Sequence, residues 1–68
     1  MKTEFYESDP FSPQKADLLL SLDTDYRFVK GDELVIETET RTTKVRVMDV
    51  RINVKSGVIS REILAFRL

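Results

Sequence analysis

The chain has 68 residues, with 11 basic and 12 acidic side chains, and it contains no histidine, cysteine or tryptophan. This length allows one domain with a thin core, because a domain of about 60 residues buries only about 60% of the surface that its unfolded chain exposes. The missing cysteine and histidine exclude a disulfide framework, a thiolate metal site and a histidine-activated nucleophile. We therefore expect a non-catalytic domain without a metal or cofactor.

The first twelve residues form an acidic segment broken by proline. They nevertheless carry Phe5, Tyr6 and Phe11, which are half of the six aromatic residues in the chain. The rings could cover a core that is too small to seal itself, since one aromatic side chain buries about 150–250 Å². They could equally anchor a partner protein. We predict an N-terminal arm over residues 1–12, followed by a single domain over residues 13–68.

The start of that domain is ambiguous between helix and strand. Ser12 followed by Pro13 is typical of a helix N-terminus, and the leucines at 18, 19 and 22 would share one helical face. The leucines at 18, 20 and 22 also alternate, as they would in a strand. The run is too short for periodicity to decide, so a short helix is favoured and a strand stays open.

The rest of the chain is typical of a β-sheet. Residues 26–68 hold 15 Val, Ile and Thr, whereas residues 1–25 hold two, and β-branched side chains favour strands. Strands are expected on both sides of a turn at Gly31, over residues 44–55, after a hairpin turn at Ser56-Gly57, and at the C-terminus after a single helical turn that begins at Ser60. The sequence thus predicts a mainly β domain, a small five-stranded curved meander or barrel.

The strand over residues 44–55 has a break in its side-chain phase. Val45 and Val47 point to one face, and the apolar side chains at 50, 52 and 54 reach the same face only if one extra residue is inserted near Met48-Asp49. One extra residue is the signature of a β-bulge, which bends a strand.

Two segments carry a resemblance to a known family. The segment Phe28-Val29-Lys30-Gly31-Asp32-Glu33-Leu34-Val35-Ile36 resembles the diverging turn of Src-homology-3-like barrels, and residues 57–63 are similar to their strand, helical turn and final strand. The resemblance implies a five-stranded SH3-like barrel over residues 26–68. The chain has no Trp and only a short stretch before Phe28, so recognition of proline-rich peptides is not implied. The Gly-Asp-Glu-hydrophobic strand also resembles the swapped-hairpin regulators of the AbrB type, which would make the protein an obligate dimer.

Charge is distributed unevenly along the chain. Residues 1–40 carry a net charge of −6 and residues 41–68 a net charge of +5. Five of the basic side chains lie on or just before the outer face of the 44–55 strand: Arg41, Lys44, Arg46, Arg51 and Lys55. They could pair across strands with acidic side chains such as Glu33, or they could bind the phosphates of a nucleic acid.

These observations predict a small interaction or regulatory module. In the favoured version it binds another protein through Phe5, Tyr6 and Phe11 together with Val35 and Met48, which occupy outward positions. In the alternative version the basic strand binds nucleic acid. An exposed edge strand would also let the domain pair with a second copy. The N-terminus is acidic and no long apolar run is present, so a cytoplasmic protein without membrane contact is expected.

Overall fold

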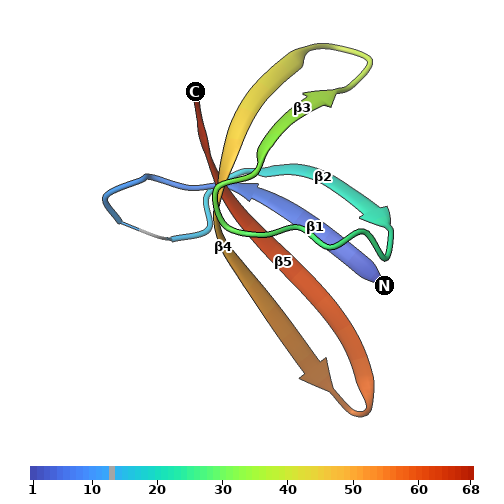
Figure 1. Cartoon of the computed structure of the whole chain (residues 1–68). Helices are drawn as coiled ribbons and strands as arrows, with labels where there is room; N and C mark the ends of the chain where they lie inside the picture. The colour runs from blue at the N-terminus through green and yellow to red at the C-terminus, as the bar shows by residue number, and fades with distance from the viewer. Residues whose placement is uncertain (13) are drawn as a thin grey trace.

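The computed structural model describes residues 1–12 and 14–68. Five strands are present: β1 (Lys2–Glu7), β2 (Leu18–Asp23), β3 (Glu33–Glu37), β4 (Thr42–Lys55) and β5 (Val58–Arg67). They form one sheet in the order β2-β1-β5-β4-β3, in which β1 runs parallel to β5 and the other neighbours are antiparallel. The sheet curls into a nearly closed barrel with β2 and β3 at its edges (Figure 1). The expectation of a mainly β, five-stranded small barrel is confirmed, but the resemblance placed it over residues 26–68, whereas β1 and β2 come from the first 23 residues.

The segment expected to be an arm contributes a strand to the middle of the sheet. β1 lies between β2 and β5, where Phe5 faces Leu20 on one side and Ile63 on the other. The Phe5 ring is buried and meets the Phe28 ring edge to face, with 5.2 Å between the ring centroids. Phe5 is therefore part of the core.

The predicted short helix is wrong, because Leu18–Asp23 forms β2 and the described residues contain no helix. The alternative based on alternating leucines is the correct one. Antiparallel pairing with β1 supplies backbone partners along the segment and packs Leu19 and Leu20 against the core. A helix this short is marginal in water without such support. Pro13, on which the predicted N-terminus of the helix partly rested, lies outside the described residues.

Two further local expectations differ from the structure. The predicted helical turn at Ser60 is absent, because β5 continues from Val58 to Arg67 with partners on β4 throughout and on β1 from Ser60 to Ala65. The segment from Tyr26 to Val29 is a loop instead of a strand. That loop has a specific role, because Phe28 packs against the core from it.

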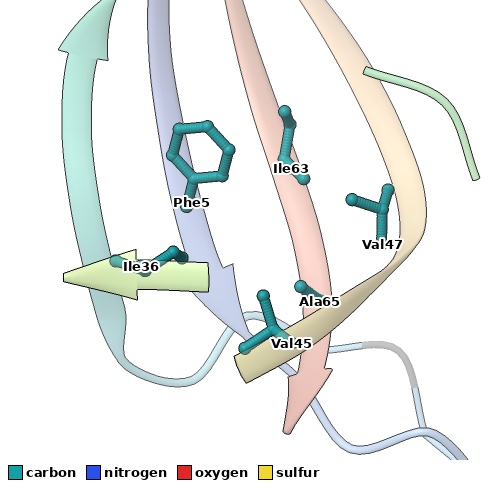
Figure 2. Packing of buried hydrophobic residues seen from close by; sticks show 6 residues of the cluster. All are labelled: Phe5, Ile36, Val45, Val47, Ile63 and Ala65. Atoms are coloured by element: carbon teal, nitrogen blue, oxygen red, sulfur yellow. The ribbon is translucent and has the colours of Figure 1, made fainter. Parts of the chain in front are cut away.

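The predicted β-bulge is confirmed. The register between β4 and β5 shifts between Val47 and Asp49, so that Val50 faces Ile63 and packs against the core. Figure 2 shows the buried side chains on the concave side of the sheet, directed toward one another. They are Phe5, Ile36, Val45, Val47, Ile63 and Ala65.

A buried arginine closes one end of the barrel. Arg61, on β5, is only 7% exposed and lies beside the Phe28 ring, with 5.2 Å from its guanidinium carbon to the ring centroid. Its Nη1 donates to the Tyr26 carbonyl at 2.7 Å, its Nη2 to the Thr24 carbonyl at 3.0 Å, and its Nε to Thr3 Oγ1 at 3.0 Å. One side chain thus ties the loop after β2 to β1 and β5.

We predict that Arg61→Met lowers the free energy of unfolding by about 2–4 kcal/mol, because it leaves three partly buried acceptors without their donor. Urea unfolding monitored by circular dichroism measures the change. Arg67→Met is the matched control, since Arg67 is exposed and its ion pair with Glu7 is worth about 1 kcal/mol or less. Equal losses in the two variants would contradict the role assigned to Arg61.

Candidate interaction surface

The structure separates the five predicted partner-binding residues. Phe5 is buried in the core and presents no surface. Tyr6 and Met48 are half-buried, and Met48 lies at the bulge. Phe11 is 95% exposed and Val35 is 59% exposed. Of the predicted set, Phe11 and Val35 therefore offer the most apolar surface to a partner.

Tyr6 belongs to a polar cluster on the outer face of β1 and β5. Its hydroxyl donates to Glu4 Oε2 at 3.3 Å, and the Lys15 ammonium lies 5.0 Å from the centre of its ring. Lys15 also forms an ion pair with Glu62 on β5. Burial, reinforced by the negative charge of Glu4, raises the pKa of Tyr6 above its usual value. Through Lys15, the cluster holds the segment before β2 against β1 and β5.

The five basic residues on or just before β4 fall into two groups. Arg46 forms an ion pair with Glu33, its direct neighbour on β3, and Arg51 Nε lies 3.0 Å from Asp49 Oδ2. Three others are exposed and form no ion pair within the part of the chain that the structure describes: Arg41, Lys44 and Lys55. For Arg46 the structure therefore shows the cross-strand partner that the sequence suggested.

The hairpin formed by β4 and β5 extends beyond the body of the barrel (Figure 1). Pairing between β3 and β4 ends with Glu33 and Arg46, and Val47 makes the last backbone contacts on that side, to Gly31 and Asp32 at 2.8 Å each. From Met48 to Lys55, β4 has β5 on one side, and among the described residues no strand pairs with its other side. This stretch is an open edge.

The open edge carries exposed apolar side chains. Ile52 is 54% exposed and Val54 is 68% exposed, and Val54 faces Ile59 across the hairpin on the same side of the sheet. The sequence had placed Ile52 and Val54 on the core-facing side, and the face is correct. They are uncovered because β1 begins to pair with β5 only at Ser60. Among the described residues, no strand therefore runs beside Val58 and Ile59 to continue the barrel over the hairpin tip.

The tip of the hairpin has a tight, well-defined geometry. Ser56 and Gly57 both have positive φ, at 52° and 79°. Two successive residues of this kind form the type I′ turn, whose twist matches that of the flanking strands. The turn therefore sets the register of the hairpin, which starts with the pair Lys55 and Val58.

Within residues 1–12 and 14–68 no pocket is found, and no group of three or more acidic side chains is placed to hold a metal ion. No helix in this part of the chain is long and apolar enough to cross a membrane. No family model matches the chain, and neither a curated protein nor a solved structure does.

The Lys15–Glu62 pair predicts a pH dependence of stability. The hydrogen bond from Lys15, followed by one from Asn53, holds the pKa of Glu62 below its usual value. A lowered pKa means that the stabilisation is present above the usual glutamate pKa and is lost as the pH falls through the lower, folded-state pKa. We expect the free energy of unfolding to fall less between about pH 5 and about pH 3 in Glu62→Gln than in the unmodified protein. Glu37→Gln, at an exposed site, should keep the full dependence, and an unchanged slope in Glu62→Gln would exclude this pair as its source.

Proposed function

We propose that the protein is a non-catalytic interaction module that binds another protein chain through the β4–β5 hairpin. The observation that carries the proposal is the open edge of β4 from Met48 to Lys55, which includes the exposed side chains of Ile52 and Val54. An extended segment of a partner can add to such an edge, gaining backbone hydrogen bonds together with contacts to every second side chain.

The composition of this edge supports the proposal. Proteins that keep an edge strand solitary protect it with proline, with charged side chains such as lysine, with β-bulges, with inward-pointing charges or with very short strands. The stretch from Met48 to Lys55 contains no proline, and three of its four apolar side chains, at 50, 52 and 54, share one face. Lys55 is the single lysine within it. Its charged side chains lie on the opposite face, so the apolar face of this edge carries no inward-pointing charge that would oppose a partner strand.

Of the two predicted residues with most exposed surface, only Phe11 is kept as a secondary contact. Phe11 lies in the loop between β1 and β2, and Val35 lies on β3, the edge strand on the other side of β4. We leave Val35 outside the proposed surface, and we assign Phe5 to the core. Nucleic acid remains the alternative ligand, and it would use the exposed cations Arg41, Lys44 and Lys55.

A photo-crosslinking amino acid introduced at Val54 tests the proposal in cells that produce the protein. Val54 lies on the proposed surface and is 68% exposed, so the substitution leaves the core intact. Val35, which is 59% exposed on β3, is the matched control. We expect ultraviolet light to yield protein adducts from position 54 and few from position 35.

The class of adduct decides between the alternatives. Protein adducts from position 54 support the hairpin as the binding surface. Nuclease-sensitive adducts would instead favour the nucleic-acid version. Adducts from position 35 alone would move the binding surface to β3 and would contradict the proposal.

A further inference from the structure

The backbone groups of the open edge have a defined alternation. Lys55 and Val58 flank a two-residue turn, and in such a hairpin the flanking pair is hydrogen-bonded. Because hydrogen-bonded and non-bonded pairs alternate, Asn53 and Arg51 also bond to β5. The N–H and C=O groups of residues 50, 52 and 54 therefore point to the open edge. In agreement, the Val50 N–H donates to Asp49 Oδ1, at 3.0 Å.

This alternation restricts how a second β4 could pair with the first in antiparallel orientation. Residues 50, 52 and 54 must face residues of the same set, so the two-fold axis passes through Arg51, Ile52 or Asn53 if most of the edge is to be used. An axis at Arg51 puts two Arg51 side chains opposite each other. An axis at Asn53 puts Arg51 opposite Lys55 of the second copy. Both registers oppose like charges, which destabilises a strand pair.

The register with its axis at Ile52 has no such conflict. It places Asp49 opposite Lys55 of the second copy, and it does so twice because of the symmetry. On the apolar face it places Ile52 opposite Ile52 and Val50 opposite Val54. Arg51 faces the neutral Asn53. One stretch of seven residues is thus complementary to itself in hydrogen bonding, in charge and in apolar contact.

We propose that the partner of the open edge is a second copy of this chain, paired β4 to β4 in antiparallel orientation with Ile52 at the two-fold axis. This inference rests on the proposed function, because it names the protein that the hairpin binds. The paired sheets run β5-β4-β4-β5 across the axis, and the exposed face of Ile52, Val54 and Ile59 becomes continuous between the two copies. The contact is isologous, so it closes at two chains and does not propagate into a fibre.

Sedimentation equilibrium from about 1 µM to about 1 mM tests the inference, a range that covers the affinities a short interface supplies. We expect a monomer–dimer equilibrium in the unmodified protein. Ile52→Lys should leave a monomer throughout, because it places two charges at the axis, while circular dichroism confirms the fold. Val35→Lys is the matched control on the other edge strand and should dimerise normally. A monomeric unmodified protein, or a dimer that survives Ile52→Lys, would overturn the inference.

Lys55→Glu tests the register itself. With the axis at Ile52 the introduced carboxylate faces Asp49 twice, and we expect the dimer to weaken about tenfold. With the axis at Asn53 the same change would face Arg51 and tighten the dimer, and with the axis at Arg51 it would have little effect. Either of these results would overturn the register.

A cysteine at the axis gives a second readout that does not depend on charge. The chain has no cysteine, so Ile52→Cys introduces a single thiol. Two residues in a hydrogen-bonded antiparallel pair have Cα atoms about 5.5 Å apart, a distance that a disulfide spans. We expect oxidation to cross-link this variant and to leave Val35→Cys as a monomer, and absence of cross-linking at position 52 would count against the pairing. If these tests fail while position 54 still cross-links a different protein, the proposed function stands and the self-pairing falls.

Discussion

A single extra residue in β4 determines where the core ends and where the open edge begins. Without the bulge between Val47 and Asp49, the apolar side chains that follow would point away from the side that Val45 and Val47 occupy. With it, Val50 still packs against the core while β4 bends away from β3. The same local irregularity therefore completes the core and releases one side of the hairpin.

The hairpin can project because Arg61 and β1 close the barrel without it. Arg61 satisfies the carbonyls of Thr24 and Tyr26 and holds Phe28 against the core. β1 fills the position between β2 and β5, so the central strands are paired on both sides. The residues after Arg51 and before Ser60 are thus not needed to seal the core, and their apolar side chains remain exposed.

Local signals in the sequence predicted the bulge, the hairpin turn and the strand content, because each depends on neighbouring residues. The parallel pairing of β1 with β5 joins residues nearly sixty positions apart, and no local pattern encodes it. The exposure of Ile52 and Val54 depends on where β1 begins against β5, which is equally non-local. No local pattern distinguishes Arg61 from the other basic residues. Its burial depends on the loop after β2, whose carbonyls at Thr24 and Tyr26 accept its hydrogen bonds. A short run of leucines fits either a helix or a strand, and this run is a strand because it pairs with β1.

Amide hydrogen exchange along β4 in dilute solution tests most directly whether the edge is open. The amides of Ile52 and Val54 point away from β5, whereas those of Arg51 and Asn53 point toward it. The structure predicts fast exchange at the first two positions and protection at the other two, and the proposed self-pairing predicts growing protection of Ile52 and Val54 as the protein concentration rises. Protection of Ile52 and Val54 that is already complete at the lowest concentration, or equal exchange at all four positions, would contradict the account.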